Sequence, residues 1–262
     1  MDRAVQAAQA ASKAWRKLGG PARGEYLYKA AAILERRLDE VARTMTREMG
    51  KTLPEAKGET ARGIAILKYY AGEGMRKIGD LIPSTDSEAL MFTTRVPLGV
   101  VGVISPWNYP VNLALVPLAT AIAAGNHVYL KPSEYTPRTA AFLRSLLAEV
   151  FPGDRVAVAT GGPDLAVAFA ALPFDHLVFT GSTAVGRRVM AAAAANLVPV
   201  TLELGGKSPQ VVFDDADLDA AVPVIVNAVV QNAGQTCSAG SRLLVQRGVH
   251  DALMERLAAA FA

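Results

Sequence analysis

The chain has 262 residues, enough for one large domain or two modest domains. Hydrophobic residues make up 51% of it and charged residues 19%, which allows a sizeable core and excludes an intrinsically disordered chain. The net charge of +3 comes from 27 basic and 24 acidic residues scattered along the sequence without a basic run, so we expect no nucleic-acid partner.

The N-terminal part is predicted to be helical. Residues 1–17 lack the continuous apolar segment of a signal peptide and are expected to form a surface helix, with an organellar presequence as the alternative. Apolar residues from Leu27 to Met49 recur at spacings of three and four, which predicts one long helix with Gly50 as its C-cap. Residues 53–75 are expected to form the next helix, and we assign no chemistry to any of these segments.

A β-hairpin is predicted at residues 80–97, inserted in the first domain. Two short apolar segments, 81–84 and 89–96, flank the polar turn 85–87, a pattern typical of a hairpin. The second segment contains Leu, Met and Phe in succession at 90–92, so we expect the hairpin to expose apolar side chains.

From residue 99 onward, strands and helices alternate, which is typical of a parallel sheet covered by helices. This predicts an α/β fold with a doubly wound parallel-sheet nucleotide-binding domain over residues 1–202. Residues 203–262 are expected to start a second α/β domain, the catalytic domain, and to be truncated. The expected strands are 99–104, 127–130, 156–159, 176–179, 198–202, 210–213 and 242–245, and the expected helices are 111–124, 137–150, 164–171, 184–195, 218–230 and 252–262.

Two further features exclude a membrane or metal function. The longest apolar stretch, 111–124, is interrupted by Asn112 and Pro117 and is shorter than the ~20 residues that span a bilayer, so we expect no membrane partner. Three aspartates precede the helix at 218–230; they are expected to cap it, and we predict no metal site. These are Asp214, Asp215 and Asp217.

The stretch from Glu203 to Cys237 carries the candidate chemistry. It offers a thiolate nucleophile and a carboxylate general base, the pair needed for covalent acyl chemistry followed by hydrolysis. A single cysteine is more often an inert core residue, and the residues themselves leave that alternative open. Because Cys237 is the only cysteine, an internal disulfide is excluded and a reducing compartment is favoured, so we expect a cytoplasmic protein.

Four motifs resemble signatures of the aldehyde dehydrogenase superfamily. They are PWNYP at 106–110, FTGSTAVG at 179–186, TLELGGKSP at 201–209 and GQTC at 234–237, and they occur in the order typical of that family. The resemblance extends from about Ala4 to the last residue. It implies the NAD-binding and catalytic domains of that family.

The resemblance implies a role for three catalytic residues. Cys237 would be the nucleophile and Glu203 the general base. Asn108, in the loop after the first strand of the sheet, would donate from its amide to a developing oxyanion. The alternative for Asn108 is that it caps the helix that starts near Pro110.

The segment from Gly181 to Gly186 is a candidate phosphate site. The chain has no GxGxxG fingerprint, but this segment follows a strand and opens a helix, whose free N–H groups attract phosphate. The hydroxyl of Ser182 adds a donor. The alternative is an ordinary capped turn; the resemblance favours pyrophosphate binding by Gly181, Ser182 and Gly186.

A candidate ribose site follows another strand of the sheet, at the edge where such sheets bind ligands. Glu134 can accept hydrogen bonds from two ribose hydroxyls, and Lys131 can donate to them, with Ser133 between them. A carboxylate there repels a 2′-phosphate, so NAD is the expected cofactor, with NADP as the alternative that Lys131 would support. A solvated ion pair is the structural alternative. The resemblance adds Trp107 to the cofactor residues.

The overall reaction implied is oxidation of an aldehyde to a carboxylic acid with NAD and water, through a thiohemiacetal and a thioester on Cys237. One alternative is a CoA-acylating relative, in which a thiol replaces water. The other is a truncated, catalytically dead fragment that retains at most nucleotide binding, because family members continue for roughly another such length beyond the cysteine.

The substrate and the assembly remain broad expectations. Pro117 resembles the branch that oxidises fatty and aromatic aldehydes, whereas residues 48–51 and 93–102 resemble the semialdehyde branch, so the partner is expected only to be a small-molecule aldehyde. In the family the hairpin joins an oligomerisation sheet, which implies a homo-oligomer for the full-length form.

Overall fold

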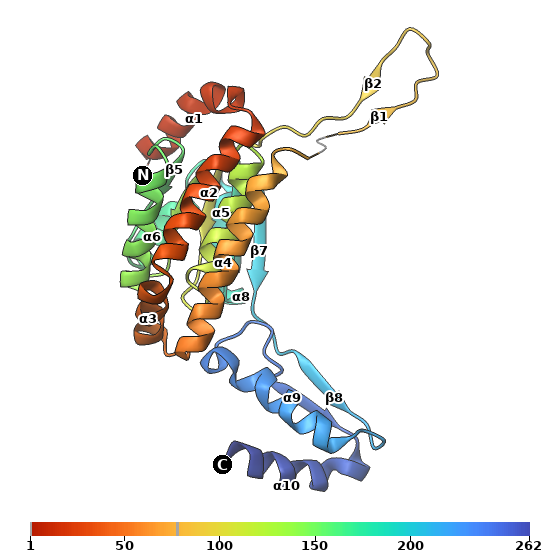
Figure 1. The fold of residues 1–262 in the computed structure, drawn as a ribbon. Coiled ribbons are helices and arrows are strands. Elements are labelled where there is room, and N and C mark those ends of the chain that lie inside the picture. Colours follow the sequence, from red (N-terminus) through yellow and green to blue (C-terminus); the bar gives the residue numbers. More distant parts are fainter. Residues whose placement is uncertain (1, 77–78) are drawn as a thin grey trace.

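The computed structural model describes residues 2–76 and 79–262 (Figure 1). Its N-terminal part consists of helices α1 (Asp2–Lys17), α2 (Gly20–Arg36), α3 (Leu38–Met49) and α4 (Leu53–Glu73). Helix α3 ends at Gly50, whose φ of 85° makes it the expected C-cap. Helix α4 begins with a capping box formed by Thr52 and Glu55.

The prediction of one long helix from Leu27 to Met49 is wrong. The backbone of Arg37, with φ −109° and ψ 18°, leaves the helical region and separates α2 from α3. The Arg37 side chain forms an ion pair with Glu40 and lies over the ring of Phe142. The apolar spacing continues through the break because both helices pack against the same neighbours, α4 and α6.

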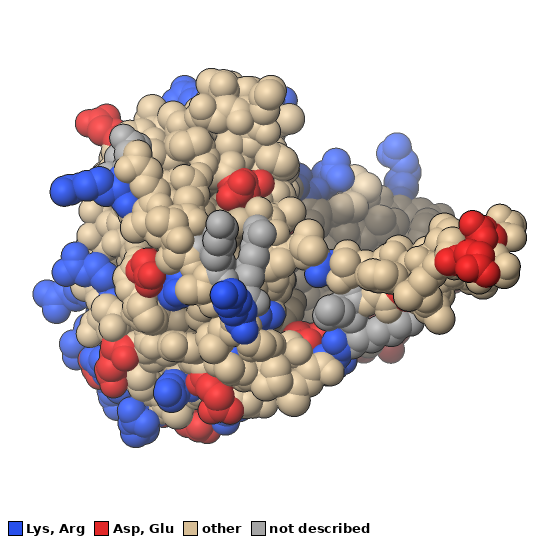
Figure 2. Space-filling model, turned by 90° about the horizontal axis from the view of Figure 1, so that it is seen from above, with Lys and Arg blue, Asp and Glu red and all other residues tan. Residues whose placement is uncertain are grey.

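The hairpin projects from the body of the molecule (Figure 1). Strand β1 (Leu81–Ile82) pairs antiparallel with β2 (Met91–Phe92), a shorter ladder than the sequence predicts. A hairpin without a packed face is marginally stable, which accounts for the short pairing. Its apolar side chains are exposed as expected; Leu90 and Phe92 are 75% and 63% exposed. Figure 2 shows acidic and basic residues intermixed over the body, and a hairpin with an acidic group near its tip.

The central sheet has five parallel strands in the order β5-β4-β3-β6-β7, and it confirms the predicted fold. The strand order reverses between β3 and β6, and ligands bind at such switch points, outside the carboxyl ends of the strands. The strands are β3 (Val100–Ile104), β4 (His127–Lys131), β5 (Val156–Val158), β6 (His176–Gly181) and β7 (Val200–Leu204).

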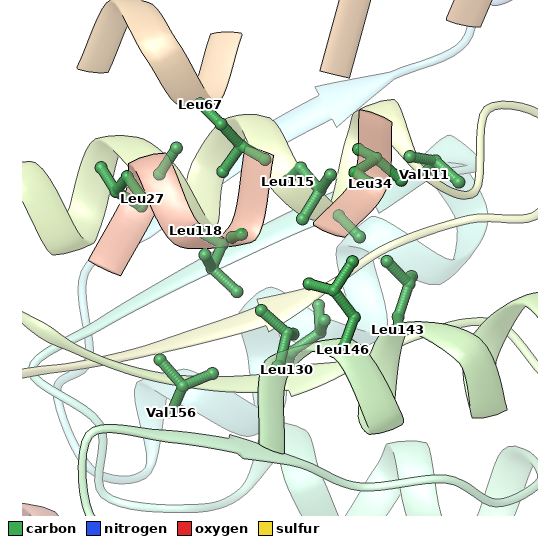
Figure 3. Packing of buried hydrophobic residues seen from close by; sticks show 14 of the residues in the cluster. Leu27, Leu34, Leu67, Val111, Leu115, Leu118, Leu130, Leu143, Leu146 and Val156 are labelled. Carbon is green, nitrogen blue, oxygen red and sulfur yellow. The ribbon is translucent and has the colours of Figure 1, made fainter. Parts of the chain in front are cut away.

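Helices cover both faces of the sheet. One cluster joins β3 and β4 to α2, α4, α5 (Asn112–Ala123) and α6 (Pro137–Val150); Figure 3 shows its leucines packed together. The other cluster joins the opposite face to α7 (Pro163–Ala170) and α8 (Thr183–Ala194), through Phe169, Leu177 and Val189. The site-bearing ends of the strands are therefore fixed from both sides.

A smaller α/β unit follows the sheet and extends below the body in Figure 1. Its strands β8 (Pro209–Val212) and β9 (Arg242–Val245) pair in parallel. Its helices are α9 (Leu218–Val230) and α10 (His250–Phe261), with the short helices η1 (Gln231–Gly234) and η2 (Arg247–Val249). A small core holds the unit together, formed by Val212, Ile225, Leu253 and Leu257.

The acidic residues before α9 have different roles. Asp217 caps the helix by accepting the N–H groups of Asp219 and Ala220, as predicted. Asp214 instead accepts a hydrogen bond from the side chain of Gln246, so the prediction that it caps α9 is wrong. Among the described residues, no group of three or more His, Cys, Asp and Glu could hold a metal ion. Over 2–76 and 79–262, no helix is both long and apolar enough to cross a membrane.

Candidate active site

A cavity of about 580 Å³ lies at the carboxyl ends of β3, β6 and β7, next to the switch point. It brings together residues from four segments that are far apart in the sequence. The predicted site residues that line it are Trp107, Asn108, Gly181, Ser182, Glu203 and Cys237. The remaining wall is formed by residues that include Leu113, Val116, Pro117, Val178, Thr180, Thr201, Gln235 and Thr236.

Cys237 follows a turn of unusual backbone conformation. Its thiol is free and exposed, so the alternative of a buried core cysteine is wrong. Asn232, Ala233 and Gly234 have φ values of 56°, 55° and 74°. A left-handed conformation costs an alanine roughly 1–2 kcal/mol, so the contacts around Ala233 have to hold this turn in place.

Asn108 holds the residues that lead to the cysteine. Its Nδ2 donates a hydrogen bond of 2.8 Å to the carbonyl of Gln235, and the Nδ2 of Asn232 donates to the carbonyl of Asn108 at 3.0 Å. An amide nitrogen has two N–H groups, and this bond uses one of them. Thr236 adds a contact to the same loop, 3.1 Å from the hydroxyl of Tyr109.

The alternative that Asn108 caps a helix is wrong. Helix α5 starts later, at Asn112, and its N-cap, Val111, has no side-chain cap. The N–H groups of Val111 and Asn112 instead donate to Glu59 on α4, at 2.9 and 3.0 Å. The amide of Asn108 is therefore left for the cysteine loop and the cavity.

Glu59 belongs to a buried ion pair that sequence reasoning missed. It pairs with Lys51, and neither side chain is exposed. The Lys51 ammonium lies 4.2 Å from the ring centre of Tyr109, next to Asn108. Burial lowers the pKa of Lys51 below its ordinary value, and the charge and hydrogen bond of Glu59 oppose that shift. Through these contacts with Tyr109, Val111 and Asn112, the pair holds the loop that carries Asn108.

Glu203 reaches the cavity from the end of β7, opposite Thr180 of β6 in the sheet register. Its side chain is exposed, so water has access to it. Glu203 and Cys237 thus line one cavity from two different elements, a strand end and a loop.

The N-terminus of α8 opens onto the same cavity. Ser182 is its N-cap and accepts the N–H of Val185 at 3.3 Å, and the first turn holds no acidic residue. The turn is therefore capped, and it also presents Gly181 and Ser182 to the cavity. Gly186 is buried, and a Cβ there would lie 2.8 Å from Leu204, so this glycine allows close packing of α8 on β7.

A second cavity of about 410 Å³ lies after β4 and β5, and Ser133, Glu134 and Arg144 are among its lining residues. Lys131 pairs with Glu134 at 2.6 Å, but the lysine is buried, so the alternative of a solvated ion pair is wrong. Burial raises the pKa of the Glu134 carboxyl, but the hydrogen bond from Lys131 and a backbone N–H outweigh it and hold the pKa below its ordinary value. Glu134 therefore presents an ionised carboxylate to this cavity.

The family model for the aldehyde dehydrogenase family matches residues 1–262. The chain belongs to the aldehyde dehydrogenase family. It is 52% identical to the α-ketoglutaric semialdehyde dehydrogenase of Bacillus subtilis over 98% of this chain and 53% of that protein. It is 41% identical to the mitochondrial succinate-semialdehyde dehydrogenase of Arabidopsis thaliana over 96% of this chain and 48% of that protein.

Solved structures agree with the fold. The crystal structure of an Escherichia coli NADP-dependent enzyme matches with a TM-score of 0.92 at 38% identity, over 98% of this chain and 54% of that one. That of PnpE in complex with nicotinamide adenine dinucleotide matches with a TM-score of 0.91 at 37% identity, over 98% of this chain and 53% of that one. The chain spans about half the length of the curated relatives it matches.

Sequence reasoning also missed the residues that hold the loop leading to Cys237. Gln235 donates from its side chain to the carbonyl of Met49, and Glu55 accepts the N–H of Asn232. Glu55 and Glu59 lie four residues apart on α4, hence on one face, and this spacing is the signal that the sequence offered. Periodicity assigned the segment to a helix and gave no reason to connect it with Cys237.

Proposed function

We propose that this chain carries the nucleophile, the general base and the dinucleotide site of an NAD(P)-dependent aldehyde dehydrogenase that oxidises an aldehyde to a carboxylic acid. The observation that carries the proposal is the single cavity lined by Cys237, Glu203 and Asn108 together with the N-terminus of α8. The Cys237 thiol is exposed to that cavity, so it is open to an electrophile.

The two cavities fit a dinucleotide. The N-terminus of α8, without an acidic residue in its first turn, suits a pyrophosphate near Gly181 and Ser182. The ionised Glu134 and the adjacent Lys131 suit the hydroxyls of a ribose. When bound, NAD(P) supplies a hydride acceptor, and the protein supplies position and charge.

The first step belongs to Cys237 and Asn108. The thiolate attacks the aldehyde carbon, a C–S bond forms, and the carbonyl oxygen becomes an oxyanion. The Asn108 N–H that does not bind Gln235 is free to donate to that oxyanion. Electrostatic stabilisation of this type is commonly the largest contribution to acyl-transfer catalysis.

The second step belongs to Glu203. Oxidation of the thiohemiacetal leaves a thioester on Cys237, which has to be hydrolysed. Glu203, exposed at the same cavity, takes a proton from a water molecule that attacks the thioester carbon. The C–S bond breaks, the acid leaves, and the thiolate is restored. The net reaction consumes aldehyde, NAD(P) and water.

Thiol labelling and two substitutions test the proposal. Iodoacetamide should alkylate Cys237 at neutral pH faster than a free thiol of pKa ~8.5. In the complete protein, Cys237→Ser should remove nearly all NADH production, while Glu203→Gln should keep the first turnover and slow the release of acid. Labelling at the free-thiol rate, with full turnover in both variants, would contradict the mechanism.

The CoA-acylating alternative needs a thiol in place of water. The exposed carboxylate of Glu203 at the cavity favours water, because a thiol attack needs no such base. Incubation with an aldehyde, NAD and CoA distinguishes the two reactions: we expect free acid and no acyl-CoA.

A semialdehyde is the substrate class that we propose to test first. The relatives at 52% and 41% identity are named for α-ketoglutaric semialdehyde and succinate semialdehyde. Semialdehydes should therefore give a higher kcat/KM in the complete protein than fatty or aromatic aldehydes. A calorimetric NAD titration of the 262-residue chain tests the alternative that it binds nucleotide without turnover.

We also propose that the hairpin takes part in a homo-oligomer. The exposure of Leu81, Leu90 and Phe92 supports this, because exposed apolar strands favour association. Light scattering should detect self-association, and Phe92→Lys should weaken it.

A further inference from the structure

The carboxylate of Glu55 connects two separate structures. Its Oε2 accepts hydrogen bonds from the backbone N–H and the hydroxyl of Thr52, at 2.9 and 2.8 Å, and so completes the capping box of α4. Its Oε1 accepts the N–H of Asn232 at 2.6 Å. A capping box needs only one of the two oxygens. The other oxygen contacts the cysteine loop, 177 residues further along the chain.

The hydrogen bond from the Asn232 N–H to Glu55 lies at the part of the loop with an unfavourable left-handed backbone. Asn232 is buried and has a positive φ, and Ala233, which follows it, has the same left-handed conformation with a Cβ atom. A buried backbone N–H requires a hydrogen-bond partner, and a charged acceptor makes a stronger bond than a neutral one. Glu55 is that acceptor. Burial raises the pKa of Glu55, but the hydrogen bonds from Asn232 and Thr52 outweigh it, so the carboxyl stays ionised.

The turn at Asn232 and Ala233 is followed within a few residues by Cys237. The side chain of Asn232 donates to the carbonyls of Asn108 and Gln235, and Gln235 accepts from Asn108 as well. Cys237 is two residues further on. A shift in the position of Asn232 would therefore displace both the amide of Asn108 and the segment that carries Cys237.

We propose that Glu55 is a positioning residue for Cys237: its carboxylate holds the left-handed turn at Asn232 and Ala233 and thereby fixes the thiol beside Asn108. Glu55 does not line the cavity and acts only through the loop. The inference rests on the proposed function insofar as Cys237 is the nucleophile whose reactivity it controls.

Three variants of the full chain separate positioning from helix capping. Glu55→Ala removes the acceptor of the Asn232 N–H and half of the capping box. Thr52→Ala removes the other half of the same box and leaves the Asn232 bond in place, so it is the matched control. Glu55→Gln keeps one acceptor oxygen, which can serve Asn232, and should therefore restore much of what Glu55→Ala loses.

Two measurements are made on each variant: the alkylation rate of Cys237 by iodoacetamide, and hydrogen exchange of the amides in residues 231–237. Glu55→Ala should slow alkylation and speed exchange by roughly tenfold each, the factor expected for loss of a hydrogen bond to a charged group. Thr52→Ala should lower the melting temperature, because it removes its half of the capping box, while the alkylation and exchange rates stay near those of the parent chain.

Equal rates in Glu55→Ala and Thr52→Ala would overturn the proposal. If Glu55→Ala does not fold, Glu55→Gln takes its place: its neutral oxygen makes a weaker bond to the Asn232 N–H than the carboxylate does, so both rates should shift in the same direction by less than roughly tenfold. Rates equal to those of Thr52→Ala would then overturn the proposal. If the parent chain is alkylated at the rate of a free thiol, the proposed role of Cys237 fails. Hydrogen exchange at residues 231–237 then decides separately whether Glu55 holds the turn.

Discussion

The strands of the sheet-bearing body (residues 2–76 and 79–204) and of the C-terminal unit (residues 209–261) are buried to different degrees. Every residue of β3 and β4 in the body is buried, and helices cover both faces of the sheet. In the C-terminal unit, β8 and β9, all of whose residues the structure describes, bury only Val212. The residues that we propose for dinucleotide binding therefore lie at the ends of buried strands. The cysteine loop depends on hydrogen bonds from the body, through Glu55 and Asn108.

The largest effect is expected from breaking the buried ion pair of the body. Glu59→Gln would remove the counter-ion of the buried Lys51 and the charged acceptor at the start of α5. We expect a loss of about 3–5 kcal/mol in the free energy of unfolding, measured by urea denaturation. The control, Glu40→Gln, breaks the exposed pair with Arg37 and should cost about 0–1 kcal/mol. Similar costs for the two variants would contradict this account.

A matched pair of leucines compares the two cores directly. Leu130 in the body and Leu253 in the C-terminal unit are both fully buried. Replacement by alanine costs about 2–5 kcal/mol, depending on how well the surroundings collapse into the space. Leu130→Ala should lie near the upper end and Leu253→Ala near the lower end, because the small core around Leu253 can close. Chemical denaturation of both variants tests this; a larger cost at Leu253 would reverse the comparison.

A moderate effect is expected on cofactor choice, which belongs to the body. Glu134→Gln removes a carboxylate that repels a 2′-phosphate, a repulsion of about 1–4 kcal/mol at ~4 Å. Lys131 pairs with Glu134 and the carboxylate is partly exposed, so we expect the lower end, about a tenfold shift toward NADP. The ratio of the two dissociation constants measures it. Glu149→Gln, which removes an exposed charge from α6, should leave the ratio unchanged.

The smallest expected effect is a pH dependence of the stability of the body, which comes from His176 at the start of β6. Burial lowers the pKa of its imidazole, and Nε2 lies 2.9 Å from the hydroxyl of Thr201. The unfolded chain therefore binds the proton more tightly than the folded chain does. The contribution of the neutral His176 imidazole to the free energy of unfolding is present above pH 6.5 and is lost as the pH falls below that value. Melting temperatures at pH 8 and pH 5.5 should differ less in His176→Gln than in the parent chain. The exposed His250 gives the control, His250→Gln.

The fold and the cavity residues could be predicted from the sequence because their signals are local. The alternation of strands and helices fixes a parallel sheet, and strands that end at one edge bring Asn108, Ser182 and Glu203 to one cavity. The break at Arg37 was not predictable, because apolar spacing is the same for one long helix and for two helices that bury against common neighbours.

Contacts between segments that are far apart in the chain could not be predicted from the sequence either. Helical spacing says which face of α4 carries Glu55 and Glu59, but not what packs against that face. Only the folded chain shows that Glu59 supplies the helix-start acceptor expected of Asn108, and that Lys51 pairs with it. The role of Asn232 depends on the left-handed turn at Asn232 and Ala233, which no residue pattern predicted.

The sharing of Glu55 between a helix start and a loop ties together two regions that would otherwise fluctuate separately. When the Glu55 side chain is displaced, Thr52 loses its partner and Asn232 loses its acceptor in the same event. Openings that displace Glu55 should therefore free residues 52–55 and 231–234 together, whereas loss of the Thr52 side chain alone leaves the Asn232 bond in place. By thermodynamic linkage, a ligand that orders the cysteine loop would also suppress fraying of α4. The start of this helix, outside the cavity, would then report whether the cavity is filled.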